Sequence, residues 1–417
     1  MALKRVVVTG LGALTPLGKT VDEYWQALAN GVSGCANIQQ FDCSKFKTRF
    51  ACEVKDFEPT NYLERKEARK IDRYCQFALI ASDEAVKDAG ISKENVDPDR
   101  VGVIFASGIG GLITFQEEVT NFALGDGTPR FNPFFIPKMI LDIAAGQISM
   151  RYGFRGPNFA VVSACASSTN AIIDAFDNIR LDKADIIITG GSEAVISAAG
   201  VGGFNAMKAL SERNDSPETA SRPFDKDRDG FVMGEGSGVL ILESLEHALA
   251  RGAKIYCEIA GGGASADAHH ITAPHPEGLG AQNVMKVALK DAGLTPQDID
   301  YINVHGTSTP LGDIAETKAI LNVFGDHAYA LNISSTKSMT GHCLGAAGAL
   351  EALACIMAVT KDIIPPTINH FTDDPDLDPK LNFTFTKAQH RTVNAALSNT
   401  FGFGGHNASV IVKKYVA

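Results

Sequence analysis

The sequence predicts an α/β protein made of two halves that repeat the same order of elements. Short apolar runs alternate with segments of helical periodicity along the 417 residues. The apolar runs are continuous, which is typical of strands covered on both faces. The order of these segments occurs twice, as expected for a duplicated unit in which strands and helices form layers.

Ten segments have the composition and length of buried strands. In chain order they are residues 5–10, 101–108, 159–164, 184–191, 237–244, 254–261, 299–306, 330–335, 395–402 and 408–414. Segments of helical periodicity, such as residues 73–90 and 281–293, lie between several of them.

The repeat is visible in three pairs of segments. Residues 84–108 resemble 287–306, residues 159–176 resemble 331–358, and residues 234–244 resemble 405–415. We therefore predict an N-terminal half, residues 1–250, and a C-terminal half, residues 251–417. Equivalent strand ends would then meet at one central site.

The composition narrows the functional classes. The formal net charge of −10 argues against general nucleic-acid binding. No apolar run of about 18 residues is recognised, so no membrane insertion is expected. The N-terminus lacks a signal-type apolar region, and the eight cysteines form no CxxC pairs, which favours reduced thiols and a cytoplasmic location.

Cys165 lies in a turn of small residues between a predicted strand and a predicted helix. One interpretation is structural, because a free cysteine often behaves as a small buried hydrophobe. The other is chemical. The first turn of a helix carries positive partial charge that stabilises a thiolate, and the thiolate is the nucleophile.

Three other motifs each lack a residue that the binding site they resemble requires. The segment TGLGALTPLG has Thr15 where a dinucleotide fingerprint needs its third glycine. The segment DKDRDGFVMGEG has Gly236 where a calcium loop needs glutamate. The histidines of HHITAPH have no carboxylate or cysteine at ligand spacing, so we expect no metal site.

Two histidines follow predicted strands in turns of small residues. His305 lies in VHGTSTPLGD, and His342 lies in KSMTGHCLGAAG close to Lys337. A single histidine in such a turn is more often structural. Two of them, opposite Cys165, favour a catalytic site.

The segment RKEARKIDR concentrates positive charge on an acidic chain. Helical spacing would place Arg65, Arg69 and Arg73 on one face, with Lys66 and Lys70 beside them. This segment is either a solvated helix face or a docking surface for an acidic partner.

Several segments together resemble the β-ketoacyl-acyl carrier protein synthases of the thiolase superfamily. They are ACASS, NVHGTSTPLGD, SSTKSMTGHCLGAAGALEA, SNTFGFGGHNAS and SRPFDKDRDGFVMGEGSGVLILE. The resemblance runs from about Arg5 to Lys414 and is strongest to the elongating type II enzymes. Thiolases carry a second catalytic cysteine in the C-terminal glycine loop, and the loop FGFGGHN has none.

This resemblance implies a layered α-β-α-β-α fold with two mixed five-stranded sheets. It also implies the decarboxylative condensation of malonyl-acyl carrier protein with an acyl group on a cysteine, by a homodimer without a bound cofactor. The segment PFFIPKMILDIAAG would lie near the dimer interface. The alternatives are a non-catalytic partner subunit that sets chain length and a thiolase-type acyltransferase.

The resemblance assigns roles to individual residues. The catalytic set is Cys165, His305, His342 and Lys337, with Glu351 as the partner of Lys337; the oxyanion donors and gate are Cys165, Phe403 and Phe401; the pantetheine contacts are Thr307, Thr309 and Thr272; the acyl pocket holds Ile109 and Phe134; and the carrier-protein dock holds Lys66, Arg69, Lys70 and Lys208. A monovalent cation near Asn303, Glu351, Ser398 and Asn399 is a further implication for which the residues themselves give no signal.

Overall fold

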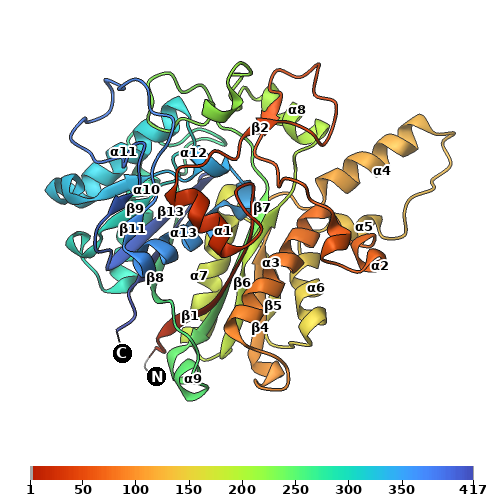
Figure 1. Cartoon of the computed structure of the whole chain (residues 1–417), viewed down its shortest axis with the longest axis horizontal. Coiled ribbons are helices and arrows are strands. Elements are labelled where there is room, and N and C mark those ends of the chain that lie inside the picture. The colour runs from red at the N-terminus through yellow and green to blue at the C-terminus, as the bar shows by residue number, and fades with distance from the viewer. Residues whose placement is uncertain (1–2, 417) are drawn as a thin grey trace.

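A mixed sheet of ten strands forms the centre of the computed structural model, which describes residues 3–416 (Figure 1). From edge to edge the strands are β10 (Asn332–Ser334), β9 (Tyr301–Asn303), β13 (Ala395–Gly402), β14 (His406–Lys413), β8 (Cys257–Ala266), β1 (Val6–Leu14), β7 (Gly236–Ser244), β6 (Ile186–Glu193), β4 (Val101–Ala106) and β5 (Asn158–Val161). Two small sheets pair β2 (Ala36–Asn37) with β3 (Phe50–Ala51), and β11 (Ile363–Ile364) with β12 (Gln389–His390).

The two halves of the large sheet have the same topology, which confirms the duplicated fold. Strands β1, β4, β5, β6 and β7 form one half, and β8, β9, β10, β13 and β14 form the other. In each half the order across the sheet is third, second, fourth, fifth and first. One correction follows. The two five-stranded sheets are joined, because Val6–Val8 pairs with Cys257–Ile259 along the edge strands β1 and β8.

Helices form three layers around the two halves of the sheet. They are α1 (Val21–Ala29), α2 (Arg65–Ala68), α3 (Arg73–Ala89), α4 (Leu112–Leu124), α5 (Phe135–Met139), α6 (Ile143–Tyr152), α7 (Ser167–Arg180), α8 (Ala198–Ala206), α9 (Leu245–Ala250), α10 (Leu279–Ala292), α11 (Pro310–Phe324), α12 (Lys337–Thr340) and α13 (Ala347–Lys361). Helices α7 and α13 contact strands of both halves, while α3 and α6 cover the first half and α10 covers the second. The expected α-β-α-β-α layering is therefore present.

The repeated segments end their helices in the same way. Helix α3 ends at Gly90 and helix α10 ends at Gly293, both with φ of 64°. A glycine adopts this left-handed conformation at little cost, and it turns the chain back toward the sheet. Each helix is then followed by the second strand of its half in chain order, β4 or β9.

Contrary to the sequence-based expectation, the helical segment Leu344–Lys361 is a long apolar run. It has 18 residues and a mean hydropathy of 1.5, so its length and composition alone would allow it to cross a membrane. However, 89% of it is buried inside the protein. The segment contains Glu351, which is buried against Lys337. We conclude that it is a core helix between the two half-sheets.

The basic segment is not one continuous helix, contrary to its helical spacing. Helix α2 ends after one turn, and the buried Asp72 caps the new helix α3 by accepting from the Tyr74 N–H. Arg73 then points inward and pairs with the buried Glu235 at 2.7 Å. Lys66, Arg69 and Lys70 remain exposed.

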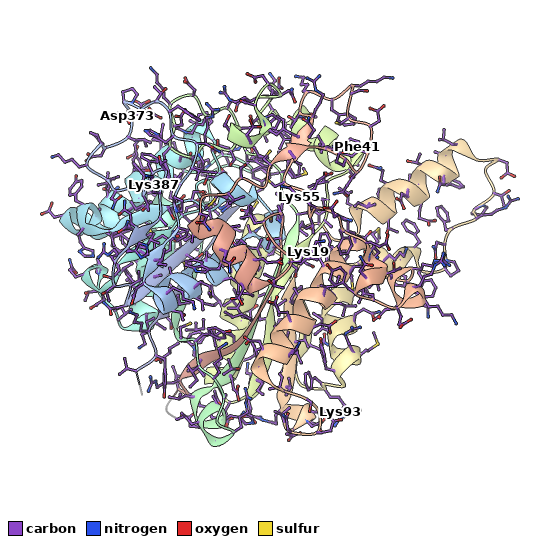
Figure 2. All side chains as sticks on the ribbon, viewed as in Figure 1. Lys19, Phe41, Lys55, Lys93, Asp373 and Lys387 are labelled. Carbon is purple, nitrogen blue, oxygen red and sulfur yellow. The ribbon has the colours of Figure 1, made fainter. Side chains whose placement is uncertain are left out.

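The hairpin of α4 and α5 extends away from the rest of the protein (Figure 1). Elsewhere, side chains fill the space between the sheet and its helices, and charged side chains such as Lys93, Asp373 and Lys387 are exposed on the surface (Figure 2).

Candidate active site

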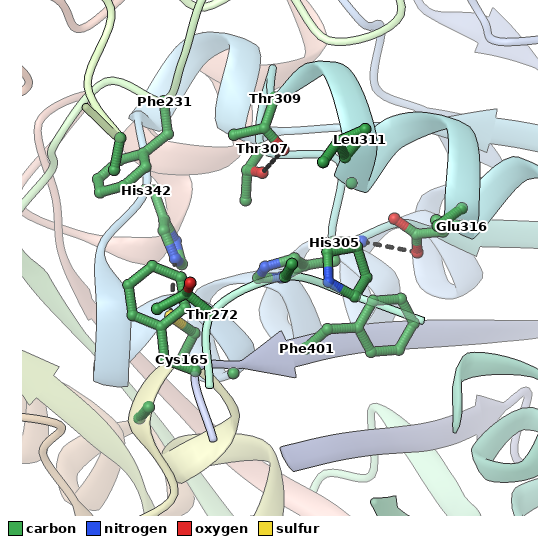
Figure 3. A pocket seen from close by; sticks show the side chains of 18 of the residues that line it. Cys165, Phe231, Thr272, His305, Thr307, Thr309, Leu311, Glu316, His342 and Phe401 are labelled. Atoms are coloured by element: carbon green, nitrogen blue, oxygen red, sulfur yellow. Dashed lines mark hydrogen bonds between the residues drawn. The ribbon is translucent and has the colours of Figure 1, made fainter. Parts of the chain in front are cut away.

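A cavity of about 450 Å³ brings together chemistry-bearing side chains from both halves of the chain (Figure 3). Its lining includes Cys165 from the first half and His305 and His342 from the second. The sequence placed these residues at equivalent strand ends, and the structure brings them to one site.

Cys165 is held in a short 3-10 turn, Ala164–Ala166, between strand β5 and helix α7. The Ser167 hydroxyl donates to the Ala164 carbonyl at 2.6 Å and accepts from the Ser163 N–H at 2.8 Å. These bonds fix the thiol at the start of α7. Strand β5 is less buried than its apolar sequence suggests, because it is an edge strand and Phe159 is exposed.

The electrostatics of the thiol differ from the prediction. Burial raises the pKa of Cys165 to about 12, although the charge of Lys337 and the backbone N–H groups of Phe403 and Cys165 oppose this rise. The helix terminus therefore does not keep the free thiol ionised. An imidazole adjoins the thiol, because His342 Nε2 lies 3.0 Å from Cys165 Sγ (Figure 3).

The backbone of His342 is fixed on both sides. Its N–H donates to the Val232 carbonyl at 2.7 Å, and its carbonyl accepts from the Gly234 N–H at 2.9 Å. The ring of Phe231 packs edge-to-face on the imidazole with centroids 5.4 Å apart. Because the backbone and one ring edge are constrained, the imidazole is directed toward Cys165.

His305 follows strand β9 and is held by a buried carboxylate. Glu316 of helix α11 accepts from the N–H groups of His305 and Gly306, both at 2.9 Å. Burial raises the pKa of Glu316 to about 7. The imidazoles of His305 and His342 lie nearly perpendicular, with ring centroids 5.2 Å apart.

The surroundings of both imidazoles disfavour the charged form. Burial lowers the pKa of His305 and of His342 well below the ordinary value, and the charge of Lys337 lowers both further. Lys337 forms a buried ion pair with Glu351, as expected. Burial raises the pKa of Glu351 to about 7 against the opposing effect of Lys337.

The remaining pocket residues lie around this centre. The hydroxyls of Thr307 and Thr309 are 3.0 Å apart, and the Phe401 ring lies 5.6 Å from the ring of His305 (Figure 3). Thr272 and Phe403 also line the cavity. The cavity lining thus combines hydroxyl groups with an aromatic ring beside His305.

The structure places the two predicted acyl-pocket residues in different locations. Ile109 lines the cavity, whereas Phe134 is not part of its lining. Phe134 precedes α5 and is exposed, with Lys70 Nζ 5.6 Å from its ring centroid. Of the predicted docking residues, Lys208 lies at the cavity, while Lys66, Arg69 and Lys70 lie outside its lining.

The sequence did not identify Glu193, Glu316 or Phe231 as site residues. Glu193 and Glu316 lie outside every segment that carries the family resemblance, whereas Phe231 lies inside SRPFDKDRDGFVMGEGSGVLILE without a predicted role. The one available signal was the position of Glu193 directly beyond the predicted buried strand 184–191, because buried carboxylates require specific partners.

Three buried oxygen atoms lie where the family resemblance implies a cation. Asn303 Oδ1, Glu351 Oε2 and Ser398 Oγ have no hydrogen-bond partner among the described residues. Asn303 and Ser398 face each other in the β9–β13 pairing. Oxygen donors suit hard cations, so the donor set fits such an ion. No cluster of three or more His, Cys, Asp or Glu side chains with metal-binding geometry occurs within residues 3–416.

Comparison with known families and proteins gives one consistent relationship. Residues 3–248 match the family "Beta-ketoacyl synthase, N-terminal domain", and residues 256–371 match "Beta-ketoacyl synthase, C-terminal domain". The chain is 51% identical to "3-oxoacyl-[acyl-carrier-protein] synthase 2" of Synechocystis sp. over 412 residues, covering 99% of this chain and 98% of that protein. The protein of the same name from Staphylococcus aureus is 48% identical over 415 residues, with 99% of each covered.

Solved structures have the same fold. A beta-ketoacyl synthase from Burkholderia phymatum superposes with a TM-score of 0.91 at 36% identity, covering 99% of this chain and 100% of that chain. A type II PKS acyl-carrier protein in complex with its ketosynthase bound to the hexaketide matches with a TM-score of 0.89 at 34% identity, with 99% and 100% covered.

Proposed function

The chain belongs to the β-ketoacyl synthase family, and we propose that it elongates fatty acyl chains in the cytoplasm by condensing malonyl-acyl carrier protein with an acyl group held on Cys165. The observation that carries this proposal is the shared cavity, in which His342 Nε2 lies 3.0 Å from Cys165 Sγ and His305 lies beside it. No bound cofactor is required.

The first stage transfers the acyl group to the enzyme. His342 Nε2 accepts the thiol proton as Cys165 Sγ attacks the thioester carbonyl of the acyl carrier. The backbone N–H groups of Cys165 and Phe403 stabilise the oxyanion. The intermediate collapses, the carrier sulfur leaves, and the imidazole returns the proton to that sulfur. Both imidazoles are then neutral, and the second stage uses the His342 tautomer that carries its proton on Nε2.

The second stage forms the new carbon–carbon bond. Loss of CO₂ from malonyl-carrier leaves an enolate, whose oxygen accepts hydrogen bonds from the N–H groups of His305 and His342. The carbanion attacks the carbonyl of the acylated Cys165, and the cysteine sulfur leaves. Burial disfavours the charged form of both imidazoles, and the charge of Lys337, which is paired with Glu351, adds to this effect.

The direct test is a condensation assay with purified protein, acyl-carrier and malonyl-carrier. We expect a 3-oxoacyl-carrier product and one CO₂ per turnover, with neither in Cys165→Ala. A non-catalytic partner subunit would give no product. A thiolase-type acyltransferase would condense acetyl thioesters without releasing CO₂.

Carrier protein is proposed to dock on the exposed residues Lys66, Arg69, Lys70 and Lys208. Two observations support this docking surface: Lys208 lies at the cavity, and the other three side chains are exposed. Reversing Lys66, Arg69 and Lys70 to glutamate should raise KM for carrier substrates and leave short pantetheine thioesters unaffected. The wild-type rate should also fall with ionic strength. An equal loss on both substrates would contradict docking.

Homodimerisation is proposed through the α4–α5 hairpin and strand β5. The hairpin exposes apolar side chains at Phe115, Phe122, Phe131 and Ile136, and β5 leaves one edge unpaired. Exposed apolar patches and open strand edges are typical of interfaces. A dimer would also allow Phe134 to contribute to a neighbouring subunit's acyl pocket. Sedimentation of a monomer at micromolar concentration would contradict this.

Ile109 is proposed as the gate to the acyl pocket. It lines the cavity near Cys165 and is 37% exposed, so its side chain has room to move. Ile109→Phe should slow acylation by chains longer than about six carbons, because overpacking costs ~1–3 kcal/mol. Acylation rates measured across chain lengths provide the test, and an unchanged profile would contradict the gate.

A further inference from the structure

Glu193 is a fully buried carboxylate at the end of strand β6, and its two oxygens accept five hydrogen bonds. Oε2 accepts from the N–H groups of Gly108 at 2.8 Å and Gly345 at 3.0 Å. Oε1 accepts from the N–H groups of Ile109 and Gly110 and from the Ser107 hydroxyl, at 3.2, 3.3 and 3.0 Å. A buried carboxylate with this many donors has been fixed in place by its surroundings.

The donors come from two segments that are far apart in the sequence. Residues 107–110 follow strand β4 and contain Ile109, whereas Gly345 lies three residues after His342. Glu193 is therefore the shared acceptor of an acyl-pocket loop and of the segment that carries a catalytic imidazole.

The backbones at Gly108 and Gly345 are in close contact with each other and with Glu193. A Cβ added at Gly345 would lie 2.1 Å from the Gly108 nitrogen and 2.7 Å from Glu193 Oε2. A Cβ added at Gly108 would also lie 2.7 Å from Glu193 Oε2. The glycines allow both backbones to approach one carboxylate, so a movement of either segment must involve Glu193.

Glu193 does not itself act on substrate. It is absent from the residues that line the cavity, whereas Gly108, Ile109, Leu344 and His342 are among them. Both of its oxygens are already engaged by protein donors. Its effect on the reaction must therefore pass through the segments that it holds.

We propose that Glu193 is a positioning residue that clamps the backbone of the Ile109 loop to the His342 segment and thereby sets the acyl chain-length preference. The inference rests on the proposed function. With the backbone clamped, the pocket opens by rotation of the Ile109 side chain alone. Without the clamp, the loop shifts and the long-chain path loses its shape first, because short chains do not pass the gate.

The test compares Glu193→Gln with wild type. Glutamine keeps the shape but turns an NH₂ group toward backbone N–H donors, which leaves those donors unpaired. Acylation of Cys165 is measured with butyryl-carrier and palmitoyl-carrier. We expect palmitoyl transfer to fall about tenfold more than butyryl transfer, a size consistent with small misplacements in active sites.

Glu243→Gln is the matched control. Glu243 is equally buried, on strand β7, and is bonded to Thr9, His247 and Arg251, none of which lines the cavity. Its loss should lower thermal stability while both acyl chains keep the same ratio of rates. Ser107→Ala removes one donor to Glu193, and it should change that ratio in the same direction as Glu193→Gln but less. This variant provides the test if Glu193→Gln does not fold.

The outcomes separate this inference from the proposed function. If wild type forms no 3-oxoacyl product, the proposed function fails. If wild type condenses, but Glu193→Gln and Ser107→Ala change butyryl and palmitoyl transfer equally, the positioning role of Glu193 is wrong. The same conclusion follows if Glu243→Gln shifts the ratio as much as Glu193→Gln.

Discussion

The turn that carries Cys165 and the turn that follows His342 occupy equivalent positions in the two halves of the chain. Each is a 3-10 turn, Ala164–Ala166 or Leu344–Ala346, and each leads into a central helix, α7 or α13. Each begins with a non-glycine residue in the left-handed region, with φ of 51° at Ala164 and 47° at Leu344. Such backbone persists only where the surroundings determine it.

The two turns are used differently at their second residue. In the first turn this residue is Cys165, which presents a thiol to the cavity. In the second it is Gly345, which has no side chain and gives its N–H to Glu193. The same turn therefore places a thiol at the cavity in one half and a backbone contact to a buried carboxylate in the other.

The largest effect is expected when the thiol of the first turn is removed and the imidazole before the second turn is kept. In Cys165→Gln the side-chain amide places its oxygen where the acyl-enzyme carbonyl would lie, within reach of the N–H groups of Cys165 and Phe403. We expect no condensation, but CO₂ release from malonyl-carrier at or above the rate of unacylated wild type. Measured CO₂ from the folded variant, with circular dichroism as control, provides the test. If the folded variant releases no CO₂, Cys165 is needed for decarboxylation as well as for condensation, and the two stages are not separate.

Removing an imidazole should produce the opposite result. In the Cys165→Gln background, His305→Ala or His342→Ala loses one donor to the enolate oxygen. We expect CO₂ release to fall about 100- to 1000-fold, the typical effect of losing one oxyanion donor. Unchanged CO₂ release in either double variant would show that the histidines act elsewhere.

Much of this comparison was accessible from the sequence. The repeat of strands and helices predicted the duplicated halves, and small-residue turns after strands identified Cys165, His305 and His342. Three features were not accessible, because they depend on contacts between distant segments. The joining of β1 to β8, the break before Arg73 and the high pKa of the thiol follow from pairing, capping and burial that local patterns do not encode.

Placing a side chain in the second turn tests its role as an anchor. In Gly345→Ala the new Cβ would lie 2.1 Å from the Gly108 nitrogen, and the backbone must move apart. We expect the free energy of unfolding to fall by ~1–3 kcal/mol, the usual cost of overpacking. Denaturant titration measures this. Gly146→Ala, where an added Cβ meets nothing within 4 Å, is the control. Equal stability of the two variants would contradict the tight contact.

The smallest expected effect concerns the charge state of the imidazole that the second turn follows. Burial and the charge of Lys337 lower the pKa of His342 in the folded protein, while the unfolded chain keeps a value of about 6.5. Below that pH the unfolded state binds the additional proton, so His342 reduces stability as the pH falls. His342→Ala lacks this contribution. Its free energy of unfolding should therefore rise relative to that of wild type as the pH falls from about 7.5 to about 5.5, the range around the unfolded pKa of about 6.5.

Both proteins must be compared over the same range, because Glu316 and Glu351 have pKa values of about 7 and titrate there too. Their raised values act in the opposite direction, since the folded state takes up protons that the unfolded state binds only at lower pH. Subtracting the variant from wild type removes most of this shared contribution and leaves that of the imidazole. A difference that stays constant with pH would mean that folding does not lower the pKa of His342, and the second-stage role of a neutral donor would lose its electrostatic basis.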